Sequence, residues 1–339
     1  MGEELFRPYA EQAGHYFFER PHEGICEHRL ETPAAWRGDA LTEDTWRIRL
    51  TADQAGELER ALEGVLSAGT PQGQLTSAGF PLPGLNAEIA GWREQLETGR
   101  GFLAISGMPI AGLTDDEAGL LFWGFGLHLG WPGAQNTDGD LLGHVVDTGE
   151  DAGDPFVRRY RTAGDIAFHC DAADVVGLLC LRTARRGGAS RIASSVTVYN
   201  ELLARRPELV ARLYEPFALD IRNENRPGQQ GWVPVVPCRH AAGALRTFYH
   251  SDYFRSAPRH PEVSAFTEEE NELLDLYEEI AHTPGIHLDM ELAPGDVQLI
   301  SNHTVIHART AYEDAAGQGA RHLLRLWLSL DLPPTESRP

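Results

Sequence analysis

A histidine and an aspartate stand two residues apart inside a strand-like stretch of this chain. The residues before the pair, 165–168, and those after it, 175–181, are typical of β-strands. Side chains on a strand alternate between its two faces, so His169 and Asp171 are expected to project to the same side. With one more histidine from a distant strand they would form a two-histidine, one-carboxylate triad. Such a triad suits non-haem iron(II) and oxygen chemistry.

The spacing alone is a weak signal, because 14 histidines and 50 acidic residues make it common by chance. The His-x-Asp/Glu strings of this chain are His169/Asp171, His250/Asp252, His260/Glu262 and His287/Asp289. The first pair leaves room for most of a β-barrel before His307, the predicted third ligand. The other three pairs lie too close to His307, and we interpret them as loop or surface pairs.

The overall charge limits the partners of the chain. A formal charge of −21 argues against nucleic acid and against anionic membranes, because both require a basic face. The sequence has no run of 18 apolar residues that would predict a transmembrane span, and its N-terminus lacks an apolar signal core. We therefore expect a cytoplasmic protein.

The basic residues are all arginine, and the chain contains no lysine. This excludes mechanisms built on an amine, such as Schiff bases and Walker-type phosphate binding. An anion bound by this protein must be held by arginine, hydroxyl groups or the backbone. The four cysteines form no Cys-x-x-Cys pair, so a structural zinc site on thiolates is not expected, and we interpret Cys170 as a small core residue.

Several local patterns predict the elements around the motif. Capping boxes start helices at Thr51/Gln54, Thr114/Glu117 and Thr267/Glu270. Further helices are expected at 86–98 and, interrupted by a proline, at 197–214. Strands are expected at 101–107, 175–181, 297–300 and 321–330, with several short strands within 220–260. Residues 1–50 are expected to be irregular, residues 131–144 to form a polar loop, and His307 to lie in a loop after the strand at 297–300.

The last predicted strand has two faces. One face carries Arg321, Leu323, Arg325 and Trp327, and the other carries His322, Leu324, Leu326 and Leu328. An arginine on so apolar a strand needs an anionic partner, either a structural carboxylate or a bound ligand.

An ordered set of motifs resembles the taurine dioxygenase (TauD/TfdA-like) family of Fe(II)- and 2-oxoglutarate-dependent oxygenases. The set is Gly101 to Gly107, His169-x-Asp171, Gly177-Leu178-Leu179, Gly187-Gly188 with Ser190 two residues on, Pro294-Gly295-Asp296, Asn302-x4-His307-x-Arg309-Thr310 and Arg321-x3-Arg325. It spans roughly residues 100–330. The resemblance implies an α+β fold with a double-stranded β-helix (jelly-roll) core and flanking helices. Residues 1–90 would form an N-terminal helical extension, 91–332 the oxygenase domain and 333–339 a C-terminal tail.

The resemblance also implies the roles of individual residues. His169, Asp171 and His307 would bind iron(II). Arg325 would bind the distal carboxylate of 2-oxoglutarate, with Arg321 assisting and the hydroxyl of Ser190 helping to hold this cosubstrate. The reaction would consume O2 and release succinate and CO2 while an unactivated C–H bond is oxidised, most simply to an alcohol. The presence of Asp171 argues against halogenation, and desaturation, epoxidation and ring formation stay open.

The substrate is less well determined by the sequence. We expect a small molecule, and spare arginines permit an anionic one, in specialised metabolism or catabolism. The candidate pocket residues are Gln135, Asn136, His144, Tyr249, Tyr253 and Arg255. Two alternatives stay open: a zinc hydrolase using His303 and His307, and a jelly-roll protein that binds a metal or small molecule without turnover. Thr304 stands where a zinc protease of this spacing needs a glutamate.

Overall fold

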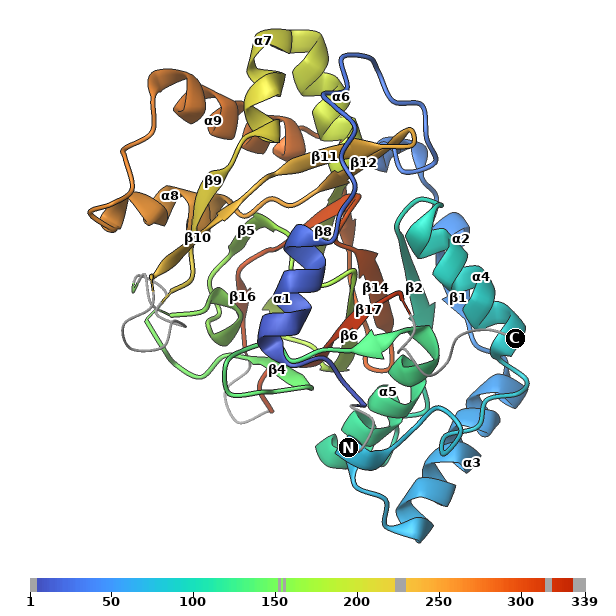
Figure 1. The fold of residues 1–339 in the computed structure, drawn as a ribbon. Helices are drawn as coiled ribbons and strands as arrows, with labels where there is room; N and C mark the ends of the chain where they lie inside the picture. Colours follow the sequence, from blue (N-terminus) through green and yellow to red (C-terminus); the bar gives the residue numbers. More distant parts are fainter. Residues whose placement is uncertain (1–4, 152–153, 155–156, 223–229, 315–318, 332–339) are drawn as a thin grey trace.

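Two β-sheets and the helices around them build the described part of the chain (Figure 1). The computed structural model describes residues 5–151, 154, 157–222, 230–314 and 319–331. Its α-helices are α1 (Tyr9–Phe18), α2 (Glu43–Trp46), α3 (Ala52–Ala68), α4 (Asn86–Glu97), α5 (Asp115–Leu129), α6 (Ser195–Arg205), α7 (Pro207–Val210), α8 (Ser251–Ser256) and α9 (Glu268–His282). Its strands are β1 (Arg47–Arg49), β2 (Phe102–Ser106), β3 (Trp131–Pro132), β4 (Gly143–Val146), β5 (Ile166–His169), β6 (Val175–Arg182), β7 (Arg186–Gly187), β8 (Ser190–Ser194), β9 (Phe217–Asp220), β10 (Trp232–Val235), β11 (Cys238–Ala241), β12 (Ala244–Thr247), β13 (His287–Met290), β14 (Val297–Ser301), β15 (Val305–Arg309), β16 (Tyr312–Glu313) and β17 (His322–Ser329).

The chain passes repeatedly between the two main sheets. The larger sheet has the strand order β1-β2-β14-β6-β17-β3, with β4 also paired to β17, and the smaller one has the order β13-β8-β15-β5. Three further pairs, β9 with β10, β11 with β12 and β7 with β16, form separate two-stranded sheets. Because β5, β8 and β15 belong to one sheet and β6, β14 and β17 to the other, residues distant in sequence face each other across the space between the sheets.

Each main sheet is covered by helices on its outer face (Figure 1). Helices α3, α4 and α5 pack on the larger sheet, and α6 and α9 pack on the smaller one. The alternation predicted for the last strand is confirmed. Leu324, Leu326 and Leu328 of β17 lie in the outer cluster, whereas Trp327 lies in the cluster between the sheets. Arg325, on the same face as Trp327, therefore projects into the space between the sheets.

The capping boxes predict helix starts correctly. Thr51, Thr114 and Thr267 are the N-caps of α3, α5 and α9, and each box is complete. Gly69 ends α3 with a φ of 63°, a left-handed conformation that costs glycine little.

Other expectations are wrong in detail. Residues 1–50 are not irregular throughout, since they contain α1, a ten-residue helix that has no side-chain cap and so lacks a sequence signature. His307 does not lie in a loop, because a short turn at 302–304 leads the chain from β14 of the larger sheet directly into β15 of the smaller sheet. The polar segment 131–144 includes β3 and the start of β4, and residues 220–260 include the helix α8. The predicted tail, 333–339, lies outside the described residues.

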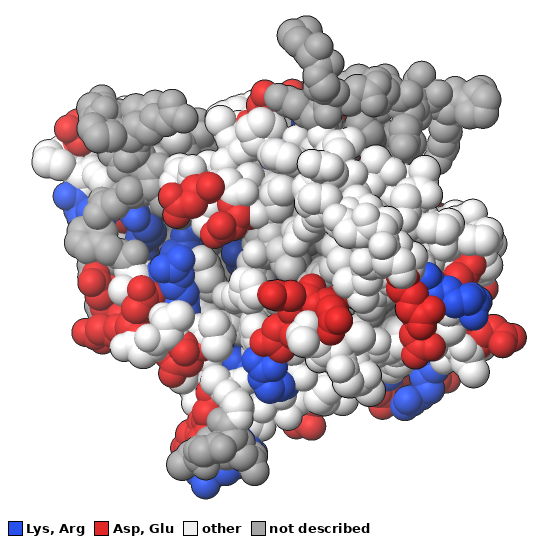
Figure 2. All heavy atoms as spheres, turned by 90° about the horizontal axis from the view of Figure 1, so that it is seen from below, with Lys and Arg blue, Asp and Glu red and all other residues white. Residues whose placement is uncertain are grey.

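The described helices are all too short or too polar to cross a membrane. Acidic and basic side chains lie in mixed clusters on the face of the molecule that Figure 2 shows.

Candidate metal centre

Three predicted metal ligands meet between the two sheets. His169 ends β5, Asp171 follows it immediately, and His307 lies in the middle of β15 directly opposite His169. The two imidazole rings are 4.1 Å apart between centroids, and one ligand atom from each of the three residues lies within 4.8 Å of the others. The period-two spacing and the antiparallel register together produce this cluster.

The polar atoms of this cluster are arranged to receive a cation. Nδ1 of His169 lies 3.0 Å from the carbonyl oxygen of Ala167, which leaves Nε2 as the lone-pair nitrogen. Burial lowers the pKa of His169 to about 3, so the ring is neutral at physiological pH. Oδ2 of Asp171 is buried and has no hydrogen-bond partner, and it lies 3.6 Å from Nε2 of His307. A buried carboxylate oxygen beside two imidazole rings fits a divalent metal ion of the iron(II) type.

Arg325 lies directly against this cluster. Its Nη1 lies 3.3 Å from Oδ1 of Asp171, and its Nε donates to Oε1 of Gln135 at 2.7 Å. Burial alone would raise the pKa of Asp171, but the adjacent Arg325 charge outweighs it and holds the pKa well below its usual range. The anionic partner that β17 required is therefore Asp171, and the carboxylate is ionised and ready to bind a cation.

A second group of cations lies farther along the same inner faces. Arg309 follows His307 by two residues on β15, and it stands opposite Ser190 of β8. Arg321 lies near it, since both guanidinium groups sit over the ring of Tyr312, at 4.8 Å and 5.1 Å. Both arginines are buried, and burial lowers the pKa of Arg309 to about 10, so it stays charged at neutral pH. We call Ser190, Arg309 and Arg321 the anion cluster, because this group of positively charged and hydroxyl side chains could bind an anion.

The anion cluster has no acidic side chain of its own. Arg309 donates to the carbonyl oxygen of Thr162 and Arg321 to that of Gly188, at 2.6 and 3.1 Å. Within the described residues neither guanidinium forms an ion pair, and Nη1 of each has no hydrogen-bond partner. Two buried positive charges without a counter-ion are costly unless an anion binds between them. Arg309 belongs to the His307-x-Arg309-Thr310 motif, but the sequence assigns it no role, since only the strand register brings it beside Ser190.

The loop that carries Asp171 is fixed by the amide of Asn302. The backbone N–H of Asp171 donates to Oδ1 of Asn302, and Nδ2 of Asn302 donates to the carbonyl oxygen of Ala173, both at 3.0 Å. Asp174, which follows Ala173, accepts hydrogen bonds from Arg20 and from the backbone N–H of Leu330. Its carboxylate also lies 3.2 Å from Nε2 of His15. Helix α1 and the residues just after it thus help to hold the metal-binding loop.

We expect Asn302→Ala to weaken metal binding by about 10- to 100-fold, because it removes the groups that orient Asp171. It also leaves two buried backbone groups unpaired, at about 1–3 kcal/mol each. Titration of the metal-free protein with iron(II), beside a thermal melt, measures both effects. Asn271→Ala, which removes an exposed amide bonded to Thr267, is the matched control and should change neither. An Asn302→Ala protein with unaltered metal affinity would contradict this role.

The predicted substrate residues are only partly brought to the centre. Gln135 contacts Arg325. Tyr253 stacks on His250 with centroids 3.7 Å apart, and the His250 ring lies 5.1 Å from that of His169. His250 was interpreted as a loop or surface residue from the sequence, but a backbone bridge to His169 places it beside the metal centre.

The remaining candidates lie elsewhere. Asn136 bonds to Asp140 and shapes its own turn, and His144 is exposed and bonds to His322. Tyr249 is fully buried against Tyr277 in the core, and Arg255 pairs with Asp275 on the surface.

His303 does not join His307 at a metal site. Its Nε2 lies 2.9 Å from Oδ1 of Asp174, and its ring stacks on Tyr16. Burial lowers the pKa of His303 to about 4. Among the described residues, His303 belongs to neither group of side chains close enough to hold a metal ion, which removes the basis of the zinc-hydrolase alternative.

Comparison with known proteins agrees with this geometry. Residues 67–327 match the family described as Taurine catabolism dioxygenase TauD, TfdA family. The chain is 34% identical over 299 residues to FR-33289 synthase of Streptomyces rubellomurinus, covering 84% of this chain and 86% of that protein. It is 27% identical over 333 residues to the taurine hydroxylase-like protein SAT17 of Stachybotrys chartarum, covering 91% and 83%.

Solved structures share the fold. Asparagine oxygenase in complex with Fe(II), 3-hydroxyasparagine and succinate superposes with a TM-score of 0.66 at 18% identity, covering 84% of this chain and 94% of that one. The non-haem iron oxygenase OrfP in complex with iron and α-ketoglutaric acid gives a TM-score of 0.62 at 16% identity, with the same coverage. By its sequence match over most of its length, the chain belongs to the TauD/TfdA family of Fe(II)- and 2-oxoglutarate-dependent oxygenases.

Proposed function

We propose that His169, Asp171 and His307 hold the catalytic iron(II) and that the protein hydroxylates a small molecule. The observation that carries this proposal is the buried, ionised Asp171 with an unpaired oxygen beside two imidazole rings. Three protein ligands leave the other coordination positions open, so the bound metal would supply oxygen activation at those positions. The protein itself fixes the ring orientations, through the contact of His169 with Ala167 and the hydrogen bonds of Asn302.

For the cosubstrate, the contacts favour an exchange of the roles that the resemblance gave to Arg325 and Arg321. Arg325 touches Asp171, so it lies at the end of the site where the keto acid group of 2-oxoglutarate would meet the metal. Arg309 and Arg321 form no ion pair among the described residues. Arg309 lies farther from the metal ligands, because it is two residues beyond His307 on β15 and two residues of strand span about 7 Å; Arg321 lies near Arg309 over the same ring. We infer that the anion cluster binds the distal carboxylate and that Arg325 orients the groups at the metal.

Gly188 tests this inference without removing a charge. A Cβ atom there would meet Nε of Arg321 at 2.7 Å, and the φ of +75° disfavours any side chain. Gly188→Ala is therefore expected to displace Arg321 and raise the KM for 2-oxoglutarate by about tenfold, which corresponds to about 1.4 kcal/mol. Gly243→Ala has the same backbone strain, with a φ of +76° and open space around it, so it should lower stability without changing this KM. Equal KM values for the two variants would argue against the anion cluster.

The substrate is proposed to be a small amino-acid-like or otherwise anionic molecule. The solved relatives carry 3-hydroxyasparagine and hydroxylated arginine, and FR-33289 synthase is named for its product, which suggests specialised metabolism. Gln135 contacts Arg325, His250 lies beside His169 and Tyr253 stacks on His250, so these three side chains could face the substrate.

We also propose that the two facing sheets are the double-stranded β-helix of this family. Two observations support this proposal. The chain crosses back and forth between the two sheets from β5 to β17, and the candidate metal site lies between them. Residues 91–332 would then be the oxygenase domain, and residues 1–90 an extension packed on it. The parallel pairing of β1 with β2 and the packing of α3 on the larger sheet favour that division. A cytoplasmic location stays a prediction.

The test is an anaerobic titration of metal-free protein with iron(II) and then 2-oxoglutarate. We expect the visible iron-to-keto-acid charge-transfer band in the wild type, and a band that needs much more 2-oxoglutarate in Arg321→Ala. Bound iron without a band in the wild type would overturn the proposed function.

A further inference from the structure

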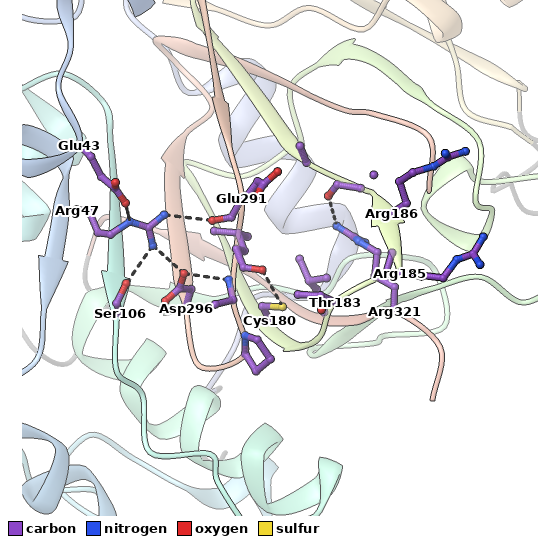
Figure 3. A pocket seen from close by; sticks show the side chains of 18 of the residues that line it. Glu43, Arg47, Ser106, Cys180, Thr183, Arg185, Arg186, Glu291, Asp296 and Arg321 are labelled. Carbon is purple, nitrogen blue, oxygen red and sulfur yellow. Dashed lines mark hydrogen bonds and ion pairs between the residues drawn. The ribbon is translucent and has the colours of Figure 1, made fainter. Parts of the chain in front are cut away.

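A cavity of about 780 Å³ lies behind Arg321, on the side of this residue where the turn 183–189 and the segment 291–296 meet (Figure 3). Cys180 and Leu323, which face each other on β6 and β17, line it, together with Gly188 and Ala189. The residues closest to Arg321 in this wall are small. The cavity therefore begins where the anion cluster ends.

The lining of the cavity is positively charged. It contains five arginines (Arg47, Arg49, Arg185, Arg186 and Arg321) and three carboxylates (Glu43, Glu291 and Asp296), although the whole chain carries a net charge of −21. A basic hollow in so acidic a protein favours an anionic occupant.

Arg321 differs from the other cations in this lining. Arg47 donates to Asp296 at 2.7 Å and to Ser106 at 3.0 Å, as Figure 3 shows, and Arg185 and Arg186 pair with Glu313. Arg321 is only 5% exposed, and its Nη1 has no partner among the described residues. A buried guanidinium that forms no ion pair among the described residues, at the wall of a basic cavity, favours an anion there.

We propose that this cavity extends the cosubstrate site, so that the enzyme accepts 2-oxo dicarboxylic acids longer than 2-oxoglutarate. This inference rests on the proposed function, because it takes the keto acid end to be at the metal and the distal carboxylate to be at Arg321. 2-Oxoadipate has one more methylene group than 2-oxoglutarate, and its distal carboxylate would pass Arg321 into the cavity. With it, one O2 and one substrate R–H would give glutarate, CO2 and R–OH, which balances as the reaction of 2-oxoglutarate does.

The first measurement is a pair of anaerobic titrations of the iron(II)-loaded protein, one with 2-oxoglutarate and one with 2-oxoadipate. The charge-transfer band reports binding of each acid without turnover. We expect Kd values within about tenfold of each other, a difference of about 1.4 kcal/mol. Aerobic incubation with 2-oxoadipate should then release glutarate. If 2-oxoglutarate gives the band and 2-oxoadipate binds more than 100-fold more weakly, the extension is wrong and the proposed function stands. If neither acid gives a band, the proposed function itself fails.

Cys180 supplies matched variants, because it lines the same cavity as Arg321. Cys180→Met adds a flexible apolar chain that narrows the cavity, and Cys180→Ala widens it. We expect Cys180→Met to weaken 2-oxoadipate binding at least tenfold with less than a threefold change for 2-oxoglutarate, and Cys180→Ala to weaken neither. Equal losses for both acids in Cys180→Met, with a normal thermal melt, would overturn the assignment of the cavity to the longer acid.

Discussion

Replacing Asp171 with alanine is expected to lower iron(II) affinity and 2-oxoglutarate turnover at least about 100-fold. Even residues that merely orient a metal ligand change affinity by about 10- to 100-fold, and Asp171 is proposed to be a ligand itself. The variant also leaves Arg325 buried without its carboxylate, which by itself costs about 3–5 kcal/mol of stability. Two losses are therefore expected from one substitution, and they must be separated.

The double variant Asp171→Ala/Arg325→Met separates them. Removing the stranded charge should restore much of the stability, as measured by denaturant unfolding, while iron binding stays poor. Asp289→Ala is a suitable control, because this carboxylate also follows a histidine by two residues but pairs with Arg191 near the surface. It should change iron binding by less than twofold. Normal turnover in Asp171→Ala, or iron binding restored together with stability in the double variant, would show that Asp171 is not a ligand.

The parts of this fold that the sequence predicts are those with local causes. Capping boxes depend on residues three apart, and they mark the starts of α3, α5 and α9 correctly. The alternation along β17 depends on residues two apart, and it correctly separates Arg325 from the outer leucines. The pairing of His169 with Asp171 follows from the same period.

The parts that were missed depend on contacts between distant segments. Arg309 lies within a motif of the resemblance, but nothing in the sequence predicts that it lies opposite Ser190, which follows only from the alignment of β15 with β8. His250 reaches the metal centre through a single bridge to His169 between segments 81 residues apart (250 − 169). Helix α1 is uncapped, and its contacts to the metal-binding loop, such as that of His15 with Asp174, lie 159 residues apart in sequence. Such register and packing follow from the whole fold and carry no local pattern.

Arg321→Met is expected to raise the KM for 2-oxoglutarate by about 100-fold, because losing a buried, hydrogen-bonded partner of a carboxylate costs about 3 kcal/mol. Methionine keeps the length of the side chain and removes its charge. Without cosubstrate the protein should be no less stable than the wild type, since the substitution removes a buried charge that lacks a counter-ion in the described structure. Iron(II) affinity should not change, as the metal ligands are untouched. Steady-state kinetics, thermal melts with and without 2-oxoglutarate, and metal titration measure the three effects.

Arg325→Met and Arg185→Met complete the comparison. Arg185 lies in the turn 183–189 and lines the same cavity as Arg321, but it forms an exposed ion pair with Glu313. Its loss should therefore leave the KM for 2-oxoglutarate within twofold of the wild-type value. Arg325→Met leaves Asp171 without its cation, so it should raise the pKa of that carboxyl and disturb metal binding more than the KM. Arg321 and Arg325 are therefore expected to give different results in these measurements. If Arg325→Met raised the KM about 100-fold with iron affinity intact, and Arg321→Met changed it less than threefold, the distal carboxylate would belong to Arg325. The unpaired charge of Arg321 would then have to be neutralised by the occupant of the cavity behind it.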